Sequence, residues 1–105
     1  MRENEYQAHL IKVLRRRFPD CFILKNDTSY IQGIPDLMVL FGTKWAALEV
    51  KGARNAVVQP NQEYYVEKLD RMSFAAFIYP ENEEGVLNDL QQTFQPRRPA
   101  RVSQR

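Results

Sequence analysis

Three charged residues at the ends of two predicted strands are the strongest chemical signal in this sequence. Asp36 follows the Gly-Ile-Pro sequence at residues 33–35, and Glu49 and Lys51 stand two positions apart on the next strand. Because side chains alternate between the faces of a strand, Glu49 and Lys51 share one face. An even number of residues in the connecting loop would bring Asp36 across from Glu49 or Lys51. An odd number without a bulge would put Asp36 on the opposite face.

This trio has the composition of a site for a divalent metal. Two neighbouring carboxylates repel each other unless a cation neutralises them, and oxygen ligands select Mg²⁺ or Mn²⁺. His9 and Cys21 are the only histidine and cysteine, which argues against zinc. A metal between Asp36 and Glu49 can polarise a phosphate and generate hydroxide, and Lys51 can stabilise developing negative charge. The trio therefore predicts metal-dependent phosphodiester hydrolysis, although a lone Glu-x-Lys on a strand is usually a solvent-facing charge pair.

The elements that must position these residues follow from hydrophobic periodicity and from the prolines. Tyr6, Leu10 and Leu14 form the apolar stripe of a first helix, and Pro60 is placed to begin a second one. The predicted helices cover residues 3–17, 61–72 and 81–94. The predicted strands cover residues 21–24, 36–41, 45–51 and 74–79. This α-β-β-β-α-β-α order predicts an α/β fold with one mixed sheet flanked by helices.

Length and composition limit the remaining possibilities. A chain of 105 residues predicts one domain, at residues 1–95, followed by a basic flexible tail at residues 96–105. The longest apolar runs are strand-sized, so we expect no membrane span, and a phosphate-binding glycine loop is absent, so we expect no nucleotide cofactor. A single cysteine fits a reducing, cytoplasmic compartment.

Basic residues make nucleic acid a plausible partner, although charge runs are more often solvated surface. An arginine cluster ends the first predicted helix, a lysine ends the first predicted strand, and the tail contains four arginines. The candidates for contact with a phosphate backbone are Arg15, Arg16, Lys25, Arg97 and Arg98.

Residues 33–36 and 48–51 together resemble the Asp…Glu-x-Lys signature of the PD-(D/E)XK nuclease superfamily. Within it, the chain is most similar to the VRR-NUC nucleases, of the standalone kind found in bacteriophages. That family also has a glutamate at the start of its first helix with a glutamine four residues later, which Glu3 and Gln7 reproduce. Its second helix opens with a glutamine after Pro-x, as Gln62 does after Pro60. The resemblance covers about residues 3–79.

The resemblance implies a restriction-endonuclease-like core with these catalytic residues: Glu3, Asp36, Glu49, Lys51 and Gln62. The two central carboxylates would bind Mg²⁺ or Mn²⁺ together with the backbone carbonyl of Val50. Glu3 would bind a water molecule on this metal, or a second metal ion. Lys51 would position or activate the attacking water, and Gln62 would orient that water or Lys51.

The resemblance further implies an endonuclease that hydrolyses DNA and leaves 5′-phosphate and 3′-hydroxyl ends. By analogy with junction resolvases, we expect a branched, structure-specific substrate such as a Holliday junction. Cutting a junction symmetrically needs two active sites, so we also expect a homodimer. One alternative is a nuclease that acts on flaps, nicks or duplex DNA with a partner. The other is a nucleic-acid-binding module of the same fold that does not cut.

Overall fold

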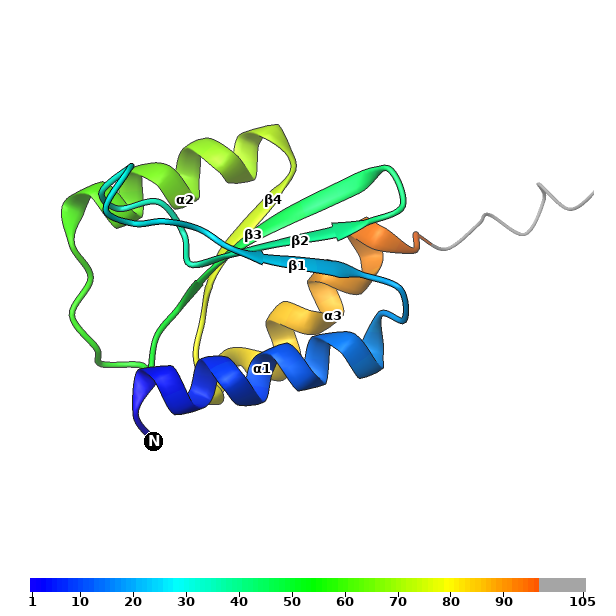
Figure 1. The fold of residues 1–105 in the computed structure, drawn as a ribbon, viewed down its shortest axis with the longest axis horizontal. Helices are drawn as coiled ribbons and strands as arrows, with labels where there is room; N and C mark the ends of the chain where they lie inside the picture. The colour runs from blue at the N-terminus through cyan, green and yellow to red at the C-terminus, as the bar shows by residue number, and fades with distance from the viewer. Residues whose placement is uncertain (97–105) are drawn as a thin grey trace, which may run out of the picture.

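A mixed four-stranded sheet forms the centre of the chain in the computed structural model, which describes residues 1–96 (Figure 1). In spatial order its strands are β1 (Phe22–Lys25), β2 (Leu37–Phe41), β3 (Lys44–Val50) and β4 (Phe74–Ile78). The β1–β2 and β2–β3 pairs are antiparallel, and β4 runs parallel to β3. The predicted α/β class with one mixed sheet is therefore confirmed. The predicted tail, with Arg97 and Arg98, lies outside the described residues except for Pro96.

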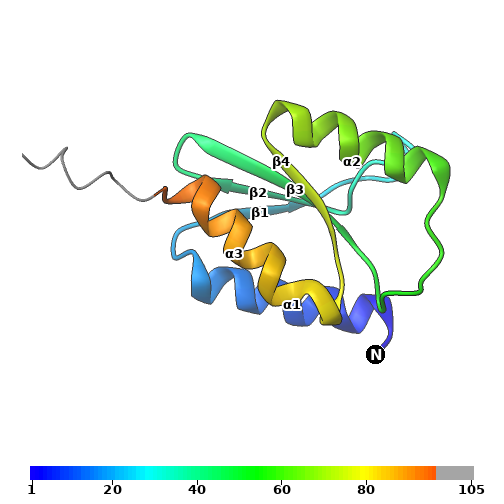
Figure 2. The same ribbon diagram turned by 180° about the vertical axis from the view of Figure 1, so that it is seen from behind.

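Helices cover both faces of this sheet (Figures 1 and 2). Helices α1 (Glu3–Arg17) and α3 (Glu83–Phe94) lie side by side on one face, and α2 (Pro60–Met72) lies on the other. The α2 helix connects β3 to β4, as a parallel pair of strands requires. No helix within residues 1–96 is both long and apolar enough to cross a membrane.

The larger part of the core lies between the sheet and the α1–α3 pair. The predicted stripe of α1 is buried there, and Leu87, Leu90 and Phe94 of α3 pack beside it. Each fully buried side chain of this size contributes about 1.5–3 kcal/mol. Polar contacts join the two helices as well, since the Tyr6 hydroxyl donates to Glu83 at 2.7 Å and Arg17 Nη2 donates to Asn88 at 2.6 Å. This packing fixes the position of α1 relative to the sheet.

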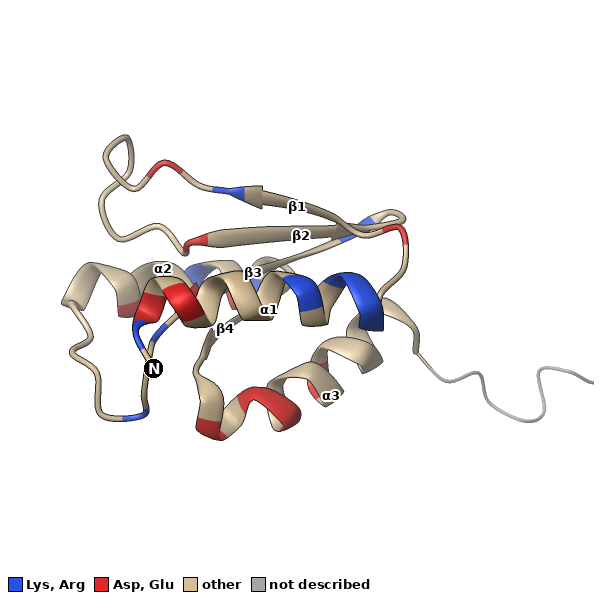
Figure 3. Ribbon diagram, turned by 60° about the horizontal axis from the view of Figure 1, so that its bottom comes forward, with Lys and Arg blue, Asp and Glu red and all other residues tan. Residues whose placement is uncertain are grey.

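Helix α1 also has a charge distribution that complements the helix dipole. Glu3 and Glu5 lie in its first turn, and Arg15, Arg16 and Arg17 lie in its last turn. Figure 3 shows the acidic and basic residues at opposite ends of the helix. Negative charge is favoured at a helix N-terminus and positive charge at a C-terminus. The acidic end of α1 lies beside the end of β3, because Gly52 there approaches Met1 and Glu3.

The core under α2 is smaller. Ala47 and Ala75 let the helix approach the sheet, and Val66 packs against them. The spacing of Tyr65, Leu69 and Met72 predicts that all three share the apolar face of this helix, but the Met72 side chain is 65% exposed. That expectation is wrong because the helix ends at Met72, where the chain turns through Ser73 into β4. The contacts of α2 are mainly with β3 and β4.

The hairpin between β2 and β3 decides whether the charged trio can assemble. Its register pairs Phe41 with Lys44, so the loop has two residues and begins with Gly42. Gly42 has φ 63°, a left-handed conformation that favours glycine in such loops. This even loop length meets the condition for Asp36 to lie on the same face of the sheet as Glu49 and Lys51. Continued by one step beyond Leu37, this register places Asp36 across from Glu49.

Helix α3 begins two residues later than its pattern indicates. A 3-10 turn (Pro80–Asn82) precedes it. The Asn82 side chain accepts a hydrogen bond from the Tyr79 amide at 2.8 Å and donates one to the Phe77 carbonyl at 3.0 Å. Such contacts between a side chain and nearby backbone compete with helix formation.

Gly52 brings the N-terminus of α1 close to the end of β3. A Cβ atom at this position would lie 2.9 Å from the Met1 carbonyl oxygen and 3.2 Å from the Glu3 amide nitrogen. Real Cβ atoms essentially never approach heavy atoms this closely, so only glycine fits without displacement. Gly52 therefore lets Glu3 approach the carboxylates of Asp36 and Glu49.

Replacement of Gly52 by Ala should lower the free energy of unfolding by about 1–3 kcal/mol, because the new methyl group overpacks this contact. Gly85→Ala is the matched control. Its Cβ atom would meet nothing within 4 Å, and it lies in α3. Alanine there should stabilise the protein by a few tenths to about 1 kcal/mol. Urea unfolding measures both changes, and a Gly52→Ala protein as stable as the wild type would contradict the close packing.

Candidate active site

A cleft of about 580 Å³ opens where the N-terminal ends of α1 and α2 meet the loop before β2. Its walls include the carboxylates of Glu3, Asp36 and Glu49 and the side chains of Gln59, Asn61 and Gln62. The loop contributes Thr28 and residues 32–34. The fold thus brings four of the predicted catalytic residues to one cleft. The fifth, Lys51, contacts two of them, Gln62 and Glu49.

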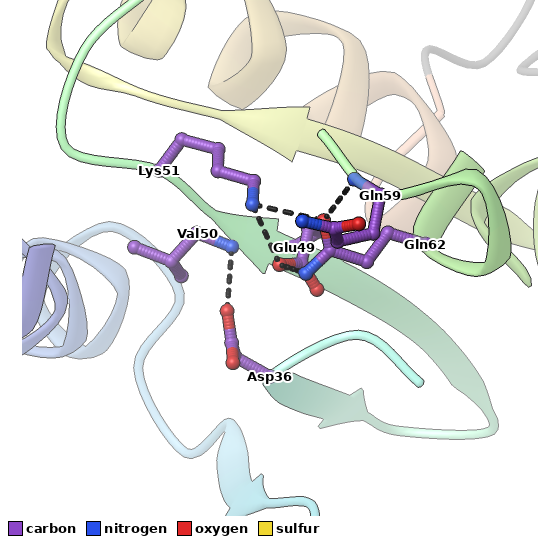
Figure 4. Close-up of polar contacts among 6 residues, drawn as sticks. All are labelled: Asp36, Glu49, Val50, Lys51, Gln59 and Gln62. Carbon is purple, nitrogen blue, oxygen red and sulfur yellow. Dashed lines mark hydrogen bonds and ion pairs between the residues drawn. The ribbon is translucent and has the colours of Figure 1, made fainter. Parts of the chain in front are cut away.

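Lys51, Gln62 and Glu49 form a connected polar network (Figure 4). Lys51 Nζ donates to Gln62 Oε1 at 2.9 Å and lies 3.6 Å from Glu49 Oε2. Gln62 Nε2 donates to the same Glu49 oxygen at 3.0 Å. Glu49 is 2% exposed and Lys51 is 7% exposed. Side chains this deeply buried hold fixed positions because each has a partner that orients it.

The start of α2 positions Gln62. Pro60 occupies the first turn, where its missing N–H removes no helical hydrogen bond. The Gln59 amide donates to Gln62 Oε1 at 3.0 Å, as in a capping box. The same oxygen accepts from Lys51, so the contact that caps the helix also orients the lysine. The predicted link between Gln62 and Lys51 is therefore present as a direct hydrogen bond.

Asp36 is held against the end of β3. Its Oδ2 accepts a hydrogen bond from the Val50 amide at 2.9 Å, and its carbonyl accepts one from the Asn26 amide at 2.8 Å. The N–H and C=O groups of one strand residue point toward the same neighbouring strand. The Val50 carbonyl therefore faces the edge of β3 on which Asp36 lies, which suits the ligand role that the resemblance implies for it.

Glu49 carries an unsatisfied oxygen. Its Oε1 is buried and has no hydrogen-bond partner among the described residues. Burial, together with the negative charges of Asp36 and Glu3, raises the pKa of Glu49 from 4.5 to about 7, although Lys51 opposes this shift. Burial also raises the pKa of Asp36. A buried acceptor without a partner, among carboxylates that outnumber the nearby lysine, is the environment that a cation would stabilise.

The donor set fits a hard divalent cation. Within residues 1–96, no three His, Cys, Asp or Glu side chains gather closely enough to hold a metal by themselves. Asp36, Glu49 and the Val50 carbonyl would supply only part of a coordination shell. Mg²⁺ commonly keeps several waters and binds through one or two carboxylates, so an incomplete all-oxygen set suits it.

Glu3 and Glu5 both lie in the first turn of α1, but their side chains have different roles. Glu3 lines the cleft and contributes to the raised pKa of Glu49. Glu5 accepts a hydrogen bond from the Arg2 amide at 3.3 Å and completes the capping contact of α1. The side chain of Glu3 is therefore the one available to the site, at its exposed rim.

The predicted phosphate-binding residues are not gathered at the cleft. Arg15 and Arg16 lie in the last turn of α1, at the opposite end from Glu3 (Figure 3). A rise of 1.5 Å per residue puts them about 18 Å from Glu3 along the helix axis. Lys25 pairs with Leu37, whose side chain is buried in the core under α1, so the lysine lies on that face of the sheet. Arg97 and Arg98 lie outside the described residues. Contact of these residues with nucleic acid stays a prediction.

The sequence pattern did not identify Asn61, Thr28 and Gln32 as residues of the cleft. Asn61 Nδ2 donates to the Gln32 carbonyl at 3.0 Å and so ties the loop to the start of α2. Gly33, with φ 95°, makes this approach possible, because a Cβ atom there would lie within 2.7–2.9 Å of Asn61. Gly33 was the available signal, since glycine is the default residue where the backbone adopts a positive φ or approaches another segment closely.

No family model, curated protein or solved structure matches the chain. Inferences about its function therefore depend on its own residues and their geometry.

Without metal, the protein should lose stability as the pH rises from about 4.5 through about 7, because the pKa of Glu49 is raised in the folded state. In this range the folded protein keeps a proton that the unfolded chain has released, so the free energy of unfolding falls with pH. Across this range the pKa shift of Glu49 lowers the free energy of unfolding by about 3 kcal/mol. Thermal unfolding in EDTA at pH 5 and pH 8 should show a smaller pH effect for Glu49→Gln than for the wild type. Equal pH effects in the two proteins would contradict the raised pKa.

Proposed function

We propose that this protein is a Mg²⁺- or Mn²⁺-dependent endonuclease that hydrolyses DNA. The observation that carries the proposal is the buried Glu49 carboxylate, which lies beside Asp36 and Lys51 and has one oxygen without a hydrogen-bond partner in the part of the chain that the structure describes. A solvent-facing Glu-x-Lys pair would be exposed, whereas these two side chains are 2% and 7% exposed. Burying such a cluster is unfavourable for stability alone, and this favours a functional reason for it.

Asp36, Glu49 and the Val50 carbonyl would hold the metal, and Glu3 would act through water or a second ion. The bound metal would polarise the scissile phosphate and lower the pKa of a coordinated water. Oxygen-only ligands fit Mg²⁺ and Mn²⁺ and do not favour zinc. Ligands supplied by two adjacent strands and one helix start would keep the site open on the cleft side, where a phosphate can enter.

Lys51 would position the attacking water and stabilise the negative charge that develops on the phosphate oxygens. The water oxygen would bond to phosphorus and release its proton to solvent while the bond to the 3′-oxygen breaks. The leaving 3′-oxygen would take up a proton from solvent, which leaves a 5′-phosphate and a 3′-hydroxyl. Gln62 would hold Lys51 in place, since it accepts the lysine's hydrogen bond at 2.9 Å and donates to Glu49 at 3.0 Å. Fixed donors of this kind need no rearrangement during the reaction.

The order of elements supports a PD-(D/E)XK core of the VRR-NUC type. Of the proposed metal ligands, Asp36 directly precedes β2, and Glu49 and Val50 end β3; Gln62 lies in the first turn of the helix that follows. The proposed glutamate begins the first helix. These positions agree with the motif order from which the resemblance was inferred.

A branched DNA, such as a four-way junction, is the proposed substrate, and a homodimer is the proposed active form. Two symmetric cuts in one junction need two active sites with related orientation. The single cysteine fits action in a reducing cytoplasm, including that of a phage-infected cell.

The first test is cleavage of a junction, a flap and a linear duplex with Mg²⁺ and with Mn²⁺. Asp36→Asn should reduce cleavage by roughly 100-fold or more, because it removes a charged ligand from the metal. Glu67→Ala is the control, since Glu67 is an exposed acid on α2 that does not line the cleft. Equal cleavage by wild type and Asp36→Asn would eliminate this active site. Binding of DNA without cleavage under any condition would favour the binding-module alternative.

The second test is the oligomeric state. Light scattering should give a mass of about 25 kDa, twice the 12.4 kDa of one chain. A dimer should also cut both strands of a junction at symmetric positions. A monomer at working concentration that leaves junctions uncut would contradict the proposed homodimer. Preferential cutting of flaps would favour the alternative of a nuclease that acts on flaps, nicks or duplex DNA with a partner.

A further inference from the structure

A tyrosine projects into solvent from the loop that forms one wall of the cleft. Tyr30 is 83% exposed, more than any other large apolar or aromatic side chain within residues 1–96. Thr28 and Gln32, two residues before and after it, both line the cleft. A two-residue separation spans at most about 7 Å of chain. The backbone of Tyr30 therefore lies next to the site where the proposed function places the scissile phosphate.

The loop that carries Tyr30 is well ordered by hydrogen bonds. Asp27 Oδ1 accepts from the Ser29 amide at 2.9 Å and from the Ser29 hydroxyl at 2.6 Å, and the Tyr30 amide donates to the Asp27 carbonyl at 3.1 Å. The two ends of the loop are joined through the Asn26 side chain, which donates to the Pro35 carbonyl at 2.8 Å just before β2. The aromatic ring is thus presented by a backbone that is already fixed, which lowers the entropy loss on binding.

The charge of the loop indicates which part of DNA it would meet. Asp27 is the only charged residue between positions 26 and 34. Hydrogen bonds from Ser29 hold the pKa of Asp27 below its usual value, so this carboxylate stays negative. The loop therefore offers no lysine or arginine to a phosphate backbone. Its aromatic ring can instead stack on the uncharged face of a base.

We propose that Tyr30 stacks on an unpaired base beside the phosphate that occupies the cleft, and that it thereby selects DNA with a branch or a displaced nucleotide at the cleavage site. This inference rests on the proposed nuclease function and adds a residue that determines specificity. In continuous duplex DNA each base is already stacked between its neighbours. Only an unpaired or displaced base offers a free face to the ring.

The test compares the affinities of Tyr30→Ala, Tyr30→Phe and wild type for two DNAs, with Ca²⁺ in place of Mg²⁺. One DNA is a continuous duplex, and the other has the same sequence with a single-stranded branch carrying 2-aminopurine at the branch point. Tyr30→Ala should bind the branched DNA about 5- to 100-fold more weakly and the duplex less than about 2-fold more weakly. Tyr30→Phe should behave as the wild type, because it keeps the ring.

Tyr64→Ala is the matched control, since Tyr64 is 54% exposed on α2 and does not line the cleft. Quenching of 2-aminopurine fluorescence by the wild type, and its loss in Tyr30→Ala, reports stacking independently of catalysis. Equal losses of affinity on both DNAs, or no loss on either, would overturn the stacking proposal. Stacking without cleavage in Mg²⁺ or Mn²⁺ would instead overturn the nuclease function, and a wild type that binds neither DNA would overturn both.

Discussion

The buried carboxylate of Glu49 is the constraint on which the rest of this structure depends. A charged group removed from water is unfavourable by several kcal/mol unless partners compensate it. Gln62 and Lys51 contact one oxygen, and the other oxygen has no partner among the described residues. The larger core under α1 and α3, together with the contacts between these helices, supplies the stability that lets the fold maintain this local destabilisation.

Close backbone approaches bring the remaining parts of the site to Glu49. The two-residue hairpin loop sets the register that puts Asp36 opposite it. Gly52 lets the start of α1 pass beside the end of β3, and Gly33 lets the loop before β2 close onto the start of α2. The site therefore forms where two helix N-termini meet two strand ends, and its partial positive charges from helix dipoles suit an anionic ligand.

The parts of this site that local rules govern could be predicted from the sequence. Strand alternation and an even hairpin loop are sufficient to place Asp36 with Glu49, and Pro60 marks the helix that carries Gln62. The cleft wall formed by Thr28 and Gln32 could not be predicted, because its position depends on the long-range contact of Asn61 with the Gln32 carbonyl. The exposure of Met72 was also missed, since periodicity continues to the last residue of a helix whether or not the sheet extends beneath it.

The two oxygens of Glu49 would separate binding of the proposed metal from positioning of the lysine. Oε2 accepts a hydrogen bond from Gln62 and lies near Lys51, whereas Oε1 has no hydrogen-bond partner within residues 1–96. A cation that binds Oε1 would leave the hydrogen bond between Gln62 and Lys51 intact, because that bond uses the amide oxygen of Gln62 and not the carboxylate. The lysine would keep its place when the charge of Glu49 is neutralised by metal. An ion pair alone would not have this property, because its attraction weakens as the carboxylate charge is shared with a metal.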